Sequence, residues 1–123
     1  MKIYIGHSND FDFKEELYNP IINSKLNDKI DFIFPHLTSK TFNSIDIIEK
    51  ADLFIAEVSR PSLGLGIEIG RAEMNNKKIL CIYNENFKEP TSLKHVNTSW
   101  QQLLQFLFNP RYVIDQLSHC LHF

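Results

Sequence analysis

The chain has 123 residues, 43% of them hydrophobic and 23% charged, which suits one domain over residues 1–123. Its 13 lysines and arginines against 15 acidic residues give a formal charge of -2, which argues against binding to duplex nucleic acid or an anionic membrane. No apolar run approaches the ~20 residues that cross a bilayer, and no signal-peptide pattern precedes the first apolar run. We therefore expect a cytoplasmic domain.

Apolar runs alternate with helical patterns along the chain. Five runs predict strands, at residues 1–5, 29–34, 52–58, 78–83 and 103–108. Helical patterns occupy residues 11–26, 44–50, 65 or 66 to 75, 91–97 and 110–121. Pro20 should divide or kink the first helix, and Asn43 or Ser44 can cap the second. Near-continuous apolar strands joined by helices predict an α/β fold, a three-layer open sandwich with a parallel sheet of about five strands.

Two polar loops follow strands of this predicted sheet. Residues 6–10 follow the first strand, and residues 58–66 follow the third. In open parallel sheets, ligands bind beyond the carboxyl ends of the strands, where the strand order reverses. We expect the two loops to lie side by side at that point.

The second loop is rich in glycine. Gly64 and Gly66 stand at a strand-to-helix junction, where backbone N–H groups can approach an anion closely. With Gly70 they form a loosened version of the dinucleotide fingerprint. That alternative is disfavoured because the pattern follows the third strand and no acidic residue ends the next one.

Glu68 is a carboxylate in the expected first turn of an otherwise apolar helix. One interpretation is a surface carboxylate that the helix dipole favours and that pairs with Arg71. The other is a nucleophile that acts on an electrophilic carbon. With the ordinary glutamate pKa of about 4.3, it would be ionised at neutral pH.

Three stretches within residues 52–83 carry a family resemblance: Ala-Glu-Val-Ser at 56–59, Pro-Ser-Leu-Gly-Leu-Gly-Ile-Glu-Ile-Gly-Arg-Ala at 61–72 and Asn-Lys-Lys-Ile-Leu-Cys at 76–81. They resemble the 2'-deoxynucleoside 5'-monophosphate N-glycosidases of the nucleoside 2-deoxyribosyltransferase group. The resemblance implies a flavodoxin-like domain that cleaves the bond between base and deoxyribose without a cofactor. It also implies that Glu68 attacks the anomeric carbon, that Ser62 binds the 5'-phosphate, and that Ser92 reaches the partner's site in a homodimer.

The chain departs from this family at three places. The acidic residue that manages the leaving base falls on Ser44, and Asp46 lies about 200° further round the helix. The tyrosine of the first strand falls on Ile3, and Tyr4 is expected to point to the opposite face. The first loop has no arginine for the phosphate.

Other polar side chains at the expected ligand edge complete the candidate site. The first loop should contact the sugar or base through Gly6, His7, Ser8 and Asn9. His7 can bind phosphate or protonate a base, or it can simply cap the loop. His36 follows the second strand on the ligand side, where it can bind substrate or remain a surface histidine. The remaining histidines show no metal-ligand spacing, so no metal site is expected.

We therefore expect an N-glycosidase that acts on a deoxyribonucleoside or its 5'-monophosphate, with Glu68 as the nucleophile and Gly6–Asn9, His36, Ser62, Gly64 and Ser92 around the substrate. The alternatives are a nucleotide-binding or sensor module without turnover, deoxyribosyl transfer between bases, and action on another N-glycoside. The residues alone do not reveal the preferred base.

Overall fold

The computed structural model describes residues 1–37, 43–84, 87 and 112–114. Its sheet has the strand order β2-β1-β3-β4-β5. The strands are β1 (Lys2–His7), β2 (Asp31–Ile33), β3 (Leu53–Glu57), β4 (Lys78–Asn84) and β5 (Tyr112–Ile114). The first four pair in parallel, and β5 pairs antiparallel with β4. This order, with its reversal between β1 and β3, is flavodoxin-like, which confirms the predicted fold class.

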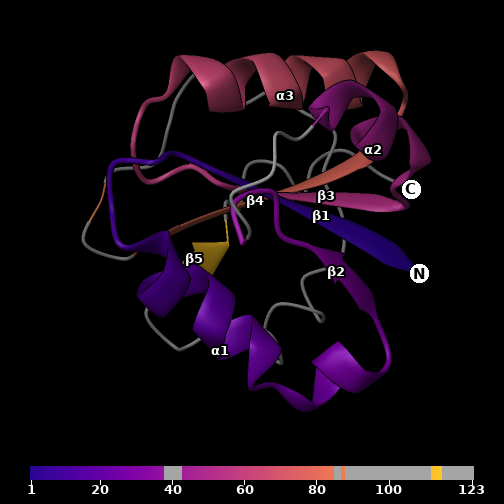
Figure 1. The fold of residues 1–123 in the computed structure, drawn as a ribbon. Helices are drawn as coiled ribbons and strands as arrows, with labels where there is room; N and C mark the ends of the chain where they lie inside the picture. The colour runs from indigo at the N-terminus through magenta and orange to yellow at the C-terminus, as the bar shows by residue number, and fades with distance from the viewer. Residues whose placement is uncertain (38–42, 85–86, 88–111, 115–123) are drawn as a thin grey trace.

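Helices cover both faces of the sheet (Figure 1). One face carries a π-helical segment η1 (Lys14–Tyr18), the short helix α1 (Asn19–Ile22) and the 3₁₀ segment η2 (Lys25–Asp28). The other face carries α2 (Ser44–Lys50) and α3 (Leu63–Met74). Pro20 lies in α1 directly after the π-helical turn, so the expected division of the first helix is confirmed.

Helix α2 has the predicted bounds because the sequence offers a typical N-cap residue directly before it. The Asn43 side chain accepts a hydrogen bond from the Ile45 N–H at 3.1 Å, which identifies Asn43 as the cap. The first strand is longer than predicted, since Gly6 and His7 belong to β1. The first loop therefore begins at Ser8.

The predicted helix at residues 110–121 is wrong at its start, because residues 112–114 form β5. A helical pattern after Pro110 favoured the helix, but pairing with the edge of β4 decides the local structure. This pairing also makes the sheet mixed rather than wholly parallel. The predicted helix at 91–97 and the predicted strand at 103–108 lie outside the described residues.

The core has two layers, one on each side of the sheet. Ile3 and Ile5 of β1 pack with Leu17, Tyr18 and others beneath η1 and α1. Tyr4, between them in sequence, packs on the opposite face with residues of α2 and α3. Among the described residues, no helix is both long enough and apolar enough to span a bilayer.

Candidate active site

The two predicted ligand loops begin next to each other at the carboxyl edge of the sheet. His7 at the end of β1 is in register with Glu57 at the end of β3. The segments that follow, from Ser8 and from Val58, therefore leave the sheet side by side. From this point the chain crosses from β1 to β2 in one direction along the sheet and from β3 to β4 in the other. The expected position at the strand-order reversal is confirmed.

Helix α3 begins at Leu63, two or three residues earlier than predicted. Ser62 caps it, because its Oγ accepts a hydrogen bond from the Leu65 N–H at 3.4 Å. Glu68 is therefore the sixth residue of the helix and lies in its second turn, not in its first. The first-turn dipole argument for this carboxylate is wrong.

The buried face of α3 includes Glu68. Leu65, Ile69 and Ala72 are buried at helical spacing, and Glu68 lies three residues after Leu65 on the same side. Burial raises the pKa of the Glu68 carboxyl above its ordinary value, whereas hydrogen bonding with Tyr4 and the positive charge of Arg71 lower it. Its Oε2 is buried and has no hydrogen-bond partner in the described part of the chain. The ordinary pKa expected from the sequence is thus corrected upward.

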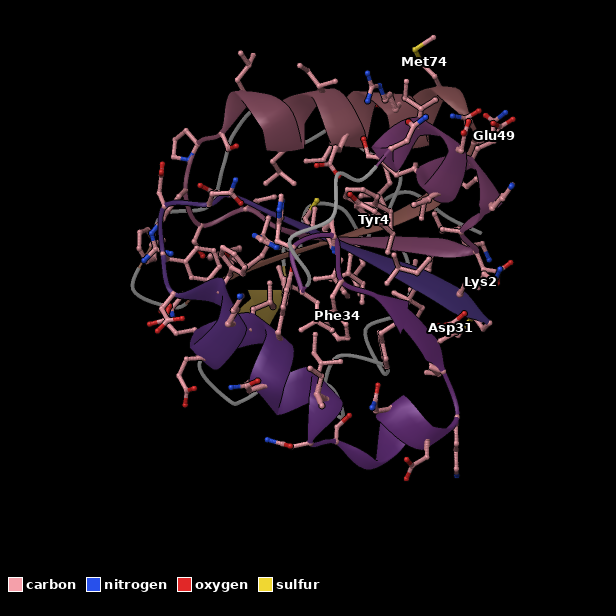
Figure 2. All side chains as sticks on the ribbon, in the orientation of Figure 1. Lys2, Tyr4, Asp31, Phe34, Glu49 and Met74 are labelled. Atoms are coloured by element: carbon pink, nitrogen blue, oxygen red, sulfur yellow. The ribbon has the colours of Figure 1, made fainter. Side chains whose placement is uncertain are left out.

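Tyr4 is the main addition that the structure makes to the predicted site. As expected, it points to the face opposite to Ile3, and it lies between the sheet and the layer formed by α2 and α3 (Figure 2). Its ring is fully buried and stacks on Phe54 with centroids 5.2 Å apart. Burial and the adjacent Glu68 carboxylate raise the pKa of its phenol. Tyr4 therefore remains a neutral hydrogen-bond donor beside the carboxylate, and Ile3 packs on the other face.

Ser44, at the place of the family's acidic residue, reaches the same side of the sheet. Its hydroxyl accepts a hydrogen bond from the Arg71 guanidinium at 3.2 Å. Arg71 thus connects the start of α2 to α3 and places a positive charge near Glu68. Asp46 is turned to another contact, because its carboxylate accepts from the Asn43 side chain at 3.3 Å.

Gly6 permits the close packing of β1 against this cluster. A Cβ atom added at Gly6 would lie 2.5 Å from Cζ of Phe54 and 3.1 Å from Cδ1 of Leu65. Both distances are shorter than a normal carbon–carbon contact. Glycine is required here by space and not by backbone angle, since no glycine in the described chain has a positive φ.

His7 lies on the face of the sheet opposite to Glu68. It is 5% exposed, its Nδ1 is 2.8 Å from the Ser8 carbonyl oxygen, and its Nε2 is 2.5 Å from the Tyr18 hydroxyl. The Tyr18 hydroxyl also accepts from the His36 N–H at 3.2 Å. Burial lowers the pKa of His7 to about 4, so the ring is neutral at pH 7. These contacts favour the loop-capping role of His7 over phosphate binding and over protonation of a base.

His36 accompanies His7 rather than Glu68. Its ring is exposed and lies 5.4 Å from the His7 ring and 5.8 Å from the Phe13 ring. The structure therefore divides the predicted site residues between the two faces. Of these predicted residues, Glu68 lies on the α3 side, where Tyr4, Arg71 and Ser44 lie near it, and both histidines lie on the α1 side.

The remaining predicted contact residues lie along the carboxyl edge. Ser8 is 1% exposed and its Oγ accepts from the Asp10 N–H at 3.2 Å, so its hydroxyl orders the first loop. Asn9 and Gly64 are exposed, and Ser62 is half-buried at the start of α3. Ser92 lies outside the described residues.

Short stretches of the sequence match known proteins. Over 39 residues the chain is 49% identical to human 5-hydroxymethyl-dUMP N-hydrolase, a match that covers 32% of this chain and 22% of that protein. Over 36 residues it is 56% identical to the Branchiostoma floridae protein of the same name, covering 29% and 34% of the two chains. The expected resemblance is confirmed. The match spans only a fifth to a third of the length of these relatives.

Solved structures extend the likeness in fold to most of the chain. The CMP N-glycosidase of Clostridium botulinum matches with a TM-score of 0.55 and 23% identity, over 78% of this chain and 80% of that one. The 2-deoxyribosyltransferase of Leishmania mexicana matches with a TM-score of 0.55 and 20% identity, over 96% and 85%. At these identities the matches establish the fold alone. No protein-family model matches the sequence.

Proposed function

We propose that this protein is an N-glycosidase that cleaves the bond between the base and the sugar of a 2'-deoxyribonucleoside or its 5'-monophosphate. The observation that carries the proposal is the Glu68 carboxylate, held on the sheet-facing side of α3 beside Tyr4 with one oxygen unpartnered among the described residues. The similarity to 5-hydroxymethyl-dUMP N-hydrolases supports the same reaction class.

Glu68 acts as the nucleophile in this proposal. Its carboxylate oxygen attacks the anomeric carbon as the bond to the base nitrogen breaks, through an oxocarbenium-like state that the negative charge stabilises. The electron pair of the broken bond leaves with the base, which takes up a proton. Water then cleaves the sugar ester, which releases the sugar and restores the carboxylate. The Tyr4 hydroxyl orients the carboxylate and favours its ionised form.

The phosphate is placed at the start of α3. Ser62 and the first backbone N–H groups of the helix, near Gly64, are donors of the kind that bind phosphate. Ser62 and Glu68 are separated by about 9 Å along the helix axis, a span that one sugar phosphate can bridge. The end of β1 and the loop that follows it, residues 6–9, then border the sugar or base, with the loop backbone ordered by Ser8.

We further infer a cytoplasmic homodimer in which Ser92 of one copy completes the other copy's site. The support for a second copy is an apolar stripe on the outer face of α3, where Leu63 is 84% exposed, Ile67 48% and Met74 86%. These residues recur at helical spacing, and Met74 points away from the sheet (Figure 2). Exposed apolar surface of this kind is typical of protein interfaces.

A binding or sensor module without turnover is the second candidate. It is favoured by Ser44, because a hydroxyl engaged with Arg71 stands where the related enzymes carry an acid for the leaving base. A serine hydroxyl cannot act as a proton donor of comparable acidity.

Incubation with a panel of deoxynucleosides and their 5'-monophosphates, with chromatographic detection of free base, tests the two candidates. Base release supports the N-glycosidase. Saturable binding with no release after prolonged incubation supports the binding module and refutes the enzyme. A second free base in the same reaction distinguishes transfer, which yields a new nucleoside, from hydrolysis. Sedimentation analysis tests the dimer, because a strict monomer would leave the proposed Ser92 contact without a partner site.

A further inference from the structure

The hydrogen bond between Arg71 and Ser44 joins two helices beside the proposed nucleophile, and the proposed reaction gives it no role. Helix α2 packs beside the C-terminal half of α3 (Figure 1). Nη1 of Arg71 donates to Oγ of Ser44 at 3.2 Å, and both side chains are half-buried. Arg71 follows Glu68 by three residues, which places the two side chains on the same side of α3. A cation and a hydroxyl therefore stand near the carboxylate.

Cleavage of the bond to the base leaves negative charge on the base, and this charge must be stabilised. A carboxylic acid can neutralise it by proton transfer. On the α3 side of the sheet, the described groups around Glu68 are the Tyr4 phenol, the Ser44 hydroxyl and the Arg71 guanidinium. None of these three is a carboxylic acid, and the Asp46 carboxylate accepts a hydrogen bond at the N-terminus of α2 instead. Among the described groups, Arg71 is the source of positive charge for the departing base.

A substrate that lies along α3 brings its base towards this pair. The phosphate is proposed to bind at Ser62, and Glu68 lies about 9 Å further along the helix axis. Arg71 lies about 4.5 Å beyond Glu68 in the same direction. The base is the end of the nucleotide opposite to the phosphate. It therefore extends from the sugar at Glu68 towards Arg71 and the start of α2.

The hydrogen bond from Arg71 makes the Ser44 hydroxyl a stronger donor. A hydroxyl can accept and donate at the same time, so an oxygen that accepts from a guanidinium keeps its own proton for another acceptor. A charged donor polarises the hydroxyl and strengthens the bond that it donates in turn. The charge of Arg71 also reaches the neighbouring groups, because it lowers the pKa of both Glu68 and Tyr4.

We propose that the Ser44 hydroxyl, polarised by Arg71, donates a hydrogen bond to the departing base and stabilises it as an anion. This inference rests on the proposed N-glycosidase function and adds the way in which the base leaves. As the Glu68 oxygen bonds to the anomeric carbon, the bond to the base nitrogen breaks, and its electron pair spreads over the base ring. Water supplies the proton after release. Ser44 contacts the base, and Arg71 is a positioning residue that acts through Ser44.

The test measures single-turnover rates of base release from the 5'-monophosphates of 2'-deoxyuridine, 5-fluoro-2'-deoxyuridine and 5-nitro-2'-deoxyuridine. These bases are increasingly acidic, so their anions need decreasing stabilisation by the protein. We expect Ser44→Ala and Arg71→Gln to slow the release of uracil about 10- to 100-fold, as loss of a hydrogen bond to a charged group does, and the release of 5-nitrouracil much less. Rates on the plateau of the pH–rate profile exclude any effect of Arg71 on the ionisation of Glu68. Ser24→Ala removes a half-buried hydroxyl on the other face and should leave all rates unchanged.

An equal loss for all the substrates would mark a purely structural role of the pair, and full activity in Ser44→Ala would remove it from the reaction. Either result overturns the inference and leaves the N-glycosidase intact. If the wild type releases no base from any of the substrates, the proposed function fails. Calorimetric binding of the free bases then decides, because 5-nitrouracil is an anion at neutral pH and uracil is not. A preference for 5-nitrouracil that Ser44→Ala loses supports the anion contact, and an equal preference in both proteins refutes it.

Discussion

Replacing Gly6 by alanine should destabilise the fold through one steric contact. The new Cβ would lie 2.5 Å from Cζ and 3.0 Å from Cε1 of Phe54, and 3.1 Å from Cδ1 of Leu65. Phe54 is fully buried and stacked on Tyr4, so its ring has little room to withdraw. Overpacking of this kind costs about 1–3 kcal/mol, and the reduced entropy of the unfolded chain returns about 0.4–1 kcal/mol of it. We expect a net loss of about 1–2 kcal/mol in the free energy of unfolding.

Gly66→Ala is the matched control. Gly66 is exposed within α3, and a Cβ added there would meet no atom within 4 Å. Alanine is favoured over glycine in a helix by about 0.8–1 kcal/mol, so this variant should be more stable than the wild type. Urea unfolding measures both as shifts in midpoint at unchanged slope. If Gly6→Ala is as stable as the wild type, or if both variants lose equal stability, the packing of β1 against Phe54 and Leu65 is not as described.

Two further changes test the electrostatics on each face of the sheet. Tyr4→Phe removes the hydrogen bonding that lowers the Glu68 pKa, so that pKa should rise further and the acidic limb of the pH–rate profile should move to higher pH, with kcat/KM down about tenfold. An unshifted limb would contradict this role for Tyr4. His7 has a pKa lowered from 6.5 to about 4 in the folded protein, so its neutral form contributes stability above pH 6.5 that is lost as the pH falls towards 4. The difference between these two pKa values corresponds to about 3 kcal/mol of unfolding free energy. His7→Gln should therefore flatten the dependence of the unfolding free energy on pH between about pH 4 and 6.5.

The fold was largely predictable because its strands are short apolar runs with clear ends. The bounds of α2 also followed from a legible cap at Asn43. The start of α3 was misplaced because Gly64 and Gly66 suggested a loop, whereas the Ser62 cap already satisfies the helix start. The strand β5 could not be foreseen, since its structure depends on pairing with β4, distant in the sequence.

The part of the site that lies on one helix was predictable from the sequence. The contacts between that helix and other elements were less predictable. Glu68 shares the period of Leu65 and Ile69, a signal that places it on the buried face of α3. The prediction that Tyr4 points to the face opposite to Ile3 is confirmed, but strand alternation does not say which of the two faces a helix with a carboxylate will cover.

The most direct test of the account is the initial rate of base release from a deoxynucleoside 5'-monophosphate by wild type, Glu68→Gln and Glu73→Gln. Glu73 is an exposed carboxylate on the same helix and serves as the matched control. The account predicts that Glu68→Gln lowers kcat by at least about 1,000-fold, as loss of a nucleophile does, while Glu73→Gln keeps the wild-type rate. A wild-type rate in Glu68→Gln, or an equal loss in both variants, would contradict the claim that Glu68 attacks the sugar.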